Sequence, residues 1–146
     1  MNSFEQATHE QDLINQEAVI KDYCSRYGLT YQDTVSRHFG YDYILEDRQG
    51  KQAIAEVKCR TISKDQYPNY MTSAHKVHCL GSYSKLMGVQ ALLIVRFIDE
   101  LAVWFVPQEP LAQRGIKFFM FKRTGEPAEP CVQIPLKHFT FIGLTS

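Results

Sequence analysis

The sequence predicts an α/β (α+β) domain in which a mixed central sheet is flanked by helices and followed by a C-terminal β extension. Three observations lead to this fold class: a helical apolar period in residues 11–27, a hairpin pattern in residues 41–58, and a continuous apolar run in residues 91–97. The 146 residues are 45% hydrophobic, which is enough apolar material for one core. We therefore expect a single domain over residues 1–146.

The first predicted element is a helix over residues 11–27. Its apolar side chains recur at helical spacing, and Gly28 is a natural stop. The residues expected on its buried face are Leu13, Ile14, Ala18, Val19 and Tyr23. Residues 29–39 then favour either a strand or a loop that leads into the hairpin.

The turn of the hairpin is set by Asp47 and Gly50. Aspartate at the first position and glycine at the fourth suit a type I turn whose glycine takes the left-handed conformation. Counting outward from this turn places Asp42 directly opposite Glu56. Lys58 lies two residues beyond Glu56 and points to the same side of its strand.

Two acids placed opposite each other repel, so the pairing of Asp42 with Glu56 needs an offsetting partner. A shared proton, a cation such as Lys58 or a divalent metal can supply it, and carboxylate oxygens suit Mg²⁺ or Mn²⁺. A bound metal provides an attacking hydroxide and stabilises charge on a phosphate, so the arrangement suits phosphodiester hydrolysis. The alternative interpretation is an ordinary exposed strand face whose neighbours pack inward, formed by Gln52, Ile54, Glu56 and Lys58.

Residues 60–70 mix cationic, hydroxyl and aromatic side chains around Pro68 and predict a surface loop. Loops of this composition touch phosphates through arginine and lysine and stack bases on tyrosine. Because the loop follows the second strand of the hairpin directly, Arg60, Lys64 and Tyr67 are candidate nucleic-acid contacts. A solvated connection is the alternative.

A second helix is predicted from Thr72 or Ser73, either of which is a good cap, to Met87. Its expected inner face comprises Ala74, Val77, Leu80 or Gly81, Ser84 and Met87. Residues 91–97 are typical of a central strand covered on both faces, and residues 102–106 should pair with it as a hairpin.

Residues 111–146 are predicted to form a C-terminal annex. The pattern indicates a strand over residues 116–122, a Gly- and Pro-rich loop over 124–130, and short extended pieces over 132–135 and 139–142. The simplest interpretation is that these added strands widen the central sheet.

The order of these elements resembles the core of the PD-(D/E)XK nuclease superfamily. A helix and a strand precede the strand bearing Asp42, and a hairpin then leads into the strand bearing Glu56 and Lys58 and into the second helix. The resemblance covers residues 11–106 and implies a restriction-endonuclease-like αβββαβ core. Tyr41 stands where the family motif has proline, which is a common departure.

The resemblance also implies roles for individual residues. Asp42 and Glu56 would bind Mg²⁺ or Mn²⁺ together with the main-chain carbonyl of Val57, and Lys58 would position or activate the water. Several members carry a glutamate on the first helix that joins the metal site, and Glu17 is the best match here. A solvated helix acid is the alternative for Glu17, and Glu10 is a weaker competitor for the same role.

The substrate expected from the resemblance is a nucleic acid, and DNA is expected before RNA. A polar residue near the start of the second helix often reaches the site in this fold. Ser73, His75 and Lys76 are the candidates, with Lys76 first because a cation helps to bind a phosphate, and simple solvent exposure is the alternative for Lys76. The small size without an attached recognition domain fits a repair, junction-cleaving or phage-encoded endonuclease, of the kind represented by Holliday junction resolvases. A homodimer is also expected, because many enzymes of the superfamily act as dimers.

Composition and charge narrow the functional classes and cellular locations that the protein can have. The 16 basic and 16 acidic residues give a formal charge of zero, which argues against indiscriminate binding to nucleic acid. No apolar run approaches the roughly 20 residues that span a bilayer, and residues 1–12 lack a signal-peptide core, so an intracellular protein with no membrane partner is expected. The four cysteines lack CxxC spacing, as reduced thiols would. A zinc site is an alternative, built from Cys59, His75, His78 and Cys79.

Two rival classes remain open at this stage. One is a catalytically inactive protein that keeps the nuclease fold to bind nucleic acid or protein. The other is a small structural protein with an unrelated mixed sheet, which would place Asp42 and Glu56 more than about 10 Å apart, beyond the reach of a shared ion.

Overall fold

The computed structural model of the chain describes the backbone over residues 3–34 and 40–144 and the side chains over residues 11–34 and 40–144. Two helices and nine strands follow one another in these residues, with 3-10 turns at Leu111–Arg114 and Leu136–His138. In chain order they are α1 (Ser3–Tyr27), β1 (Thr30–Asp33), β2 (Tyr43–Glu46), β3 (Gln52–Cys59), β4 (Asn69–Ser73), α2 (Ala74–Met87), β5 (Gln90–Arg96), β6 (Leu101–Phe105), β7 (Lys117–Phe121), β8 (Glu129–Pro135) and β9 (Thr140–Phe141).

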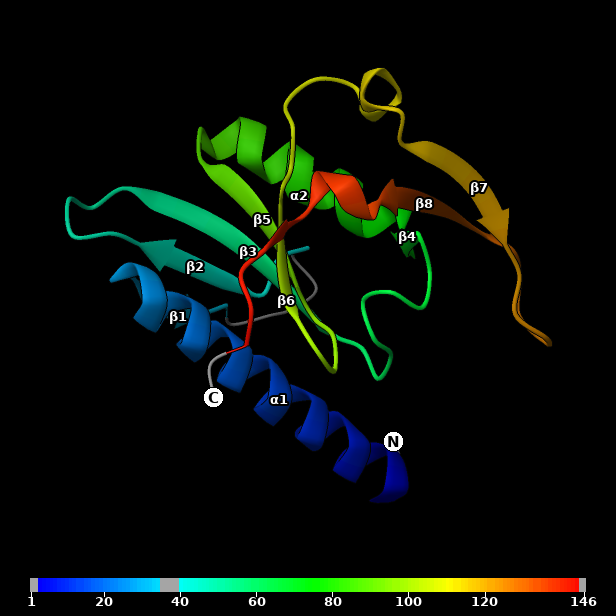
Figure 1. Ribbon diagram of the computed structural model, residues 1–146, viewed down its shortest axis with the longest axis horizontal. Helices are drawn as coiled ribbons and strands as arrows, with labels where there is room; N and C mark the ends of the chain where they lie inside the picture. The colour runs from blue at the N-terminus through cyan, green and yellow to red at the C-terminus, as the bar shows by residue number, and fades with distance from the viewer. Residues whose placement is uncertain (1–2, 35–39, 145–146) are drawn as a thin grey trace.

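The main sheet is mixed and lies between the two helices, which confirms the predicted fold class (Figure 1). Its strand order is β1-β2-β3-β5-β6-β9, with β3 and β5 parallel and every other pair antiparallel. Side chains of α1 pack on one face of the sheet and side chains of α2 pack on the other. Double coverage explains why β5 is apolar without alternation.

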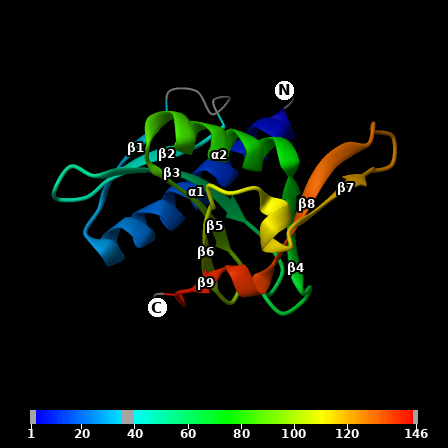
Figure 2. The same cartoon turned by 90° about the horizontal axis from the view of Figure 1, so that it is seen from above.

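The annex does not simply widen this sheet, as the sequence suggested. Only β9 extends it, by pairing with β6, while β7 and β8 join β4 in a separate three-stranded sheet of order β4-β8-β7. Figure 2 shows β7 and β8 standing to one side of the main sheet. The error arose because residues 69–73 were assigned to a loop and a helix cap, so the partner of β8 went unrecognised. Val132 and Ile134 of β8 are fully buried in the core beside α2.

The hairpin has the predicted turn and register. Asp47 and Lys51 close it through a backbone hydrogen bond of 2.9 Å, and Gly50 has a φ of +83°. The Asp47 carboxylate also accepts the amide hydrogens of Gln49 and Lys51 at 2.9 and 2.8 Å. Along the strands Ile44 pairs with Ile54.

Helix α1 is longer than predicted and presents a different face. It begins at Ser3 instead of residue 11, and its first half extends beyond the edge of the sheet (Figure 1). Ile14 and Ala18, predicted to be buried, are exposed. The buried face is Val19, Ile20, Tyr23 and Cys24, in the half of the helix that packs on the sheet.

Helix α2 begins and ends where the caps predicted. Ser73 is its N-cap residue, and Gly88 takes the left-handed conformation at its C-terminus with a φ of +68°. Val77, Leu80 and Ser84 are buried as expected. Met87 is exposed, contrary to the prediction, because residues 85–88 of the last turn all face solvent. Across the described residues, neither helix is long and apolar enough to cross a membrane.

Gly40 generates a stability prediction, because it combines a φ of +90° with close contact to α2. A Cβ at this position would lie 2.5 Å from the Cβ of Cys79. We expect Gly40→Ala to lower the free energy of unfolding by about 2 to 4 kcal/mol, from left-handed strain together with the clash.

The matched control is Gly125→Ala, which has a φ of +79° but no neighbour within 4 Å of the new Cβ. It should cost only about 1 to 2 kcal/mol, since strain acts alone there. Urea unfolding of both variants measures the difference. Equal losses would contradict the close packing of Gly40 on α2.

Candidate active site

The centre of the candidate site lies on β3, a strand that is covered on both faces. Alternation directs Ile54, Glu56 and Lys58 towards α2, while Ala55 and Val57 point towards α1. Ile54 is fully buried and Glu56 is 1% exposed, so the alternative of an ordinary solvated strand face is wrong. A glutamate at the middle of a buried strand requires a compensating partner.

Asp42 lies just before β2 and is held by two hydrogen bonds to β3 and one backbone hydrogen bond to Thr34, the residue after β1. Its N–H donates to the carbonyl of Ala55 at 2.9 Å, and its carbonyl accepts the N–H of Thr34 at 3.0 Å. Its side-chain Oδ2 accepts the N–H of Val57 at 3.0 Å. The register of the hairpin, continued by one residue, sets Asp42 opposite Glu56 as predicted. The Asp42 residue is only 4% exposed, so two carboxylates share a buried space.

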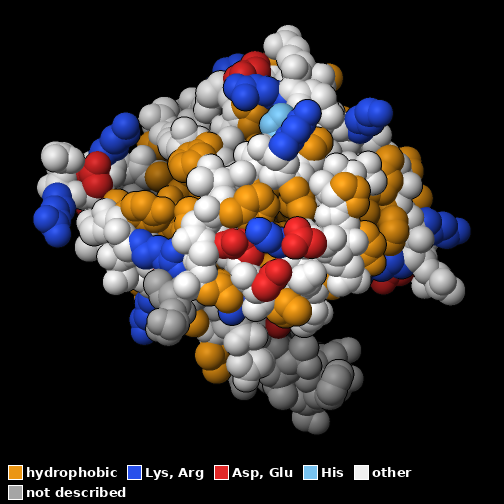
Figure 3. All heavy atoms as spheres, in the orientation of Figure 1, with side chains coloured by type: hydrophobic (Ala, Val, Ile, Leu, Met, Phe, Trp, Pro, Cys, Tyr) orange, Lys and Arg blue, Asp and Glu red, His pale blue; other side chains and the backbone are white. Residues whose placement is uncertain are grey.

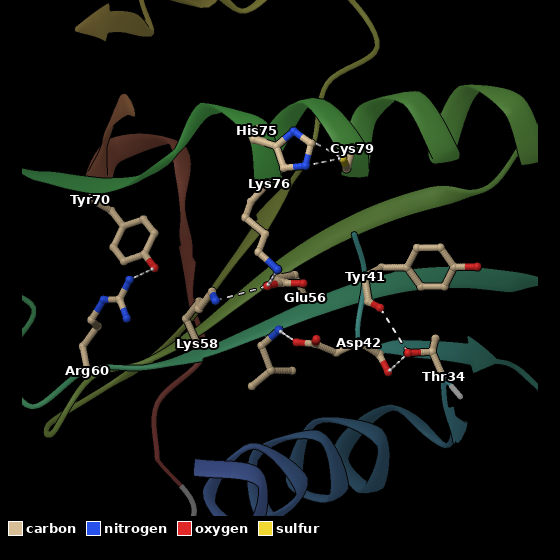
Figure 4. Close-up of polar contacts among 11 residues, drawn as sticks. Thr34, Tyr41, Asp42, Glu56, Lys58, Arg60, Tyr70, His75, Lys76 and Cys79 are labelled. Atoms are coloured by element: carbon tan, nitrogen blue, oxygen red, sulfur yellow. Dashed lines mark hydrogen bonds and ion pairs between the residues drawn. The ribbon is translucent and has the colours of Figure 1, made fainter. Parts of the chain in front are cut away.

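Two lysines approach the carboxylate of Glu56 (Figure 4). The Nζ atom of Lys58 lies 3.2 Å from Oε1, and the Nζ atom of Lys76, from the first turn of α2, lies 3.7 Å from the same oxygen. Both lysine side chains are partly exposed, so they connect the buried acids with the surface. Lys76 thus reaches the site, as the sequence suggested.

The second oxygen of Glu56 is the least satisfied atom in the site. Oε2 is buried and makes no hydrogen bond with any described residue. Burial raises the pKa of Glu56 above its ordinary value, and the nearby Asp42 raises it further, while Lys58 and Lys76 act in the opposite direction. A buried oxygen without a donor, beside a second carboxylate, is a position that suits a hard cation.

Asp42 and Glu56 fit the donor set of Mg²⁺ or Mn²⁺, which bind oxygen ligands and commonly use only one or two carboxylates. In the described part of the chain, no three His, Cys, Asp or Glu side chains form a group that could hold a metal. Any such ion would therefore need further ligands of another kind, such as main-chain carbonyls, water or substrate phosphate.

Glu17 is not brought to this pair. Its side chain is exposed on α1, and its Oε1 accepts a hydrogen bond from the hydroxyl of Tyr31 on β1 at 3.2 Å. Its supporting role stays a prediction that this geometry does not favour. Glu10, the weaker competitor, lies outside the described side chains.

The predicted nucleic-acid contacts of the 60–70 segment lie in different surroundings. Arg60 donates to the hydroxyl of Tyr70 at 2.9 Å, with its guanidinium 5.2 Å from the centre of that ring. Lys64 lies 3.7 Å from the carboxylate of Glu100. Tyr67 is 56% exposed. Their role as nucleic-acid contacts stays a prediction.

The zinc alternative is not supported. His75 and Cys79 lie together on α2, with Nε2 and Sγ 3.6 Å apart, but His78 is turned to Ser82 instead. Cys59 packs with the α1 face of the sheet, on the side away from α2.

Sequence reasoning missed two residues that shape the site. Thr34 donates its hydroxyl to the carbonyls of Tyr41 and Asp42, both at 3.2 Å, and so fixes the segment before β2. Tyr70 is buried beneath Arg60, and burial raises its pKa to about 12. No local sequence pattern pointed to these contacts. Thr34 lies in residues 29–39, for which strand and loop were both open, and Tyr70 was assigned to the loop of residues 60–70.

Charges of both signs are interspersed on the surface in the view of Figure 3. This agrees with the formal charge of zero and with the expectation that any face for nucleic acid is local.

The raised pKa of Glu56 predicts a specific pH dependence of stability. The folded chain binds the Glu56 proton more tightly than the unfolded chain does, so this contribution to stability is fully present below pH 4.5, the ordinary pKa, and is lost as the pH rises through the raised value. Glu56→Gln keeps the neutral form at every pH. The unfolding free energy of the wild type should therefore fall relative to that of Glu56→Gln as the pH rises above 4.5.

Urea unfolding of both proteins between about pH 4 and 8, with a chelator present, measures this difference. Glu126→Gln, in the exposed turn before β8, is the matched control for the loss of one negative charge. A wild type that gains stability relative to Glu56→Gln over this range would contradict the burial of an uncompensated acid.

Comparisons with known proteins agree with the fold. The structure is similar to Hjc of Archaeoglobus fulgidus, a Holliday junction resolvase from an archaeal hyperthermophile, with a TM-score of 0.54 and 16% identity over 84% of this chain and 87% of that one. This confirms the restriction-endonuclease-like core. No curated protein matches the chain. The model of the family described as phage putative PDDEXK endonuclease matches residues 3–142, and the chain therefore belongs to that family.

Proposed function

We propose that this protein is a Mg²⁺- or Mn²⁺-dependent DNA endonuclease. The observation that carries the proposal is the buried pair of Asp42 and Glu56, with one oxygen of Glu56 unsatisfied among the described residues and two lysines beside the other. The family to which the chain belongs supports endonuclease activity, and the resolvase with a similar fold supports DNA as the substrate.

Each residue has a defined task in this proposal. Asp42, Glu56 and the carbonyl of Val57 would hold the ion, which supplies, when bound, a water of lowered pKa and a positive charge on the phosphate. The Val57 amide fixes the Asp42 carboxylate by donating to Oδ2. Lys58, already 3.2 Å from Glu56, holds and orients the attacking water by donating hydrogen bonds.

Lys76 has a related but separate task. It reaches the site from α2, and its partly exposed side chain can turn from Glu56 to a phosphate oxygen of the substrate. Its charge would then move from an acid of the protein to the reacting group. Lys76 would thus offset the charge of Glu56 before DNA binds and the charge of the phosphate afterwards.

The oligomer and the place of action belong to the same proposal. A homodimer would present two such sites, one to each strand of a DNA. Action inside the cell fits the four cysteines, all of which are free thiols.

Cleavage assays test the assignment directly. Incubation of linear, circular, single-stranded and branched DNA with Mg²⁺ or Mn²⁺ should give cleavage by the wild type. Asp42→Asn, Glu56→Gln and Lys58→Ala should each lower the rate by orders of magnitude, because each removes a metal ligand or the cation that orients the water.

Lys85→Ala is the matched control, since Lys85 is an exposed lysine in the last turn of the same helix that carries Lys76. It should cleave like the wild type, while Lys76→Ala should be slower. Equal cleavage by the wild type and the three site variants would refute the site. No cleavage by the wild type would favour the inactive binding module instead.

Metal binding can be measured without any cleavage. An ion that binds only the folded chain at 100 times its dissociation constant should raise the free energy of unfolding by about 2.7 kcal/mol. We expect Mn²⁺ to stabilise the wild type in this way and to have little effect on Asp42→Asn or Glu56→Gln. Glu46→Gln, at the exposed end of β2, is the control that should respond like the wild type. A full response in the two site variants would exclude Asp42 and Glu56 as ligands.

A further inference from the structure

A pocket with a volume of about 490 Å³ lies directly beyond the candidate active site. It is lined by the segment that follows β3 and by the small sheet of β4 and β8. Two of its lining residues, Arg60 and Tyr70, lie on the Lys58 side of the acids in Figure 4. Its size is within the range of small-ligand sites in proteins. The metal site does not use it.

The strand β3 links this pocket to the site. Alternation along an extended chain sends Glu56, Lys58 and Arg60 to the same side, with each about 7 Å beyond the last. Arg60 thus stands one such step from Lys58 and already lines the pocket. A polymer held at Lys58 would bring its neighbouring unit to the pocket.

The walls of the pocket suit a flat aromatic ligand with polar edges. Apolar groups dominate the lining, while Asn69 and Gln133 add amides that can donate and accept hydrogen bonds. Tyr67, 56% exposed, lies on the lining and offers a ring for stacking. The apolar members are Ile62, Pro68, Met71, Phe97 and Leu136.

The charges of the lining favour an anionic ligand. Arg60 and Lys64 are both part of it, and it contains no acidic residue. Glu100 contacts Lys64 from outside the lining, at 3.7 Å. A stacking surface flanked by cations and continuous with a phosphodiester site matches a nucleotide within a strand better than it matches a peptide.

We propose that this pocket receives a nucleobase unstacked from the DNA strand next to the bond that is cut. The proposal rests on the proposed function and deepens it by naming the substrate class. Taking a base out of a duplex costs free energy, and the cost is least where the base is already unpaired. The preferred substrate is therefore DNA with an unpaired nucleotide beside the cut, as at a branch or gap, and not uninterrupted duplex.

Binding of a fluorescent base tests the pocket separately from catalysis. The probe is a branched DNA with one unpaired 2-aminopurine at the branch, titrated with protein in the absence of divalent cations. Stacking on Tyr67 should quench the fluorescence. Tyr67→Ala should abolish most of the quenching and weaken binding about tenfold, whereas Tyr67→Phe should keep both.

Tyr27→Ala is the matched control, because Tyr27 is 52% exposed at the end of α1, beside the turn of the hairpin. It should bind and quench like the wild type. An abasic nucleotide at the probe position, or an uninterrupted duplex of the same sequence, should bind the wild type about tenfold more weakly.

Three outcomes would overturn the proposal: no quenching with the wild type, equal binding of duplex and branched DNA, or equal loss in Tyr67→Ala and Tyr27→Ala. RNA of the same sequence binding as tightly as the DNA would overturn the assignment to a DNA strand. Failure of the pocket and failure of the proposed function are distinguishable. Quenching without cleavage in Mg²⁺ or Mn²⁺ would refute the nuclease activity and support the base-binding pocket. Cleavage without quenching would support the nuclease activity and refute the pocket.

Discussion

The burial of Glu56 beside Asp42 is the constraint on which the rest of the structure depends. Two carboxylates in a covered sheet repel each other and lose their hydration, and both effects raise the pKa of Glu56. Lys58 and Lys76 offset part of this cost from the surface side. A stable fold would place an apolar residue at position 56, since replacing buried charges by packed hydrophobic groups is often neutral or stabilising. The retained acid is therefore best explained by function.

Asp42 lies outside any strand and is held in place by contacts with its surroundings. Asp42 precedes β2, and its position depends on the amide of Val57 and on the hydroxyl of Thr34. Gly40 lets the chain pass close to Cys79 on α2. The hairpin turn at Asp47 and Gly50 sets the register from the other end. Rigid backbone contacts on both sides thus position a side chain whose own charge works against burial.

The sequence predicted this hairpin well because its information is local. The Asp47–Gly50 turn has one favoured geometry, and a fixed turn determines every pair along both strands, including Asp42 with Glu56. The caps of α2 and the apolar run of β5 are local signals too. These local signals were sufficient to predict the order of the core elements and to recognise the resemblance to a nuclease family.

What the sequence did not predict depends on contacts between distant residues. Tyr70 pairs with Ile134 across 64 positions, so neither β4 nor the small sheet could be recognised from either segment alone. The pocket between Arg60 and that sheet was invisible for the same reason, although Arg60, Lys64 and Tyr67 had been singled out. The exposure of Ile14 and the contact of Glu17 with Tyr31 depend on how α1 lies on the sheet, which periodicity does not encode.

The most direct test of the account is the position of a bound ion. An anomalous difference map from a crystal soaked with Mn²⁺ should show a peak within about 2 Å of a carboxylate oxygen of both Asp42 and Glu56. Lys58 should remain beside that peak. A peak bound elsewhere on the protein, with Asp42 still held by Val57 and Glu56 still paired with the lysines, would contradict the claim that this buried pair exists to hold a metal.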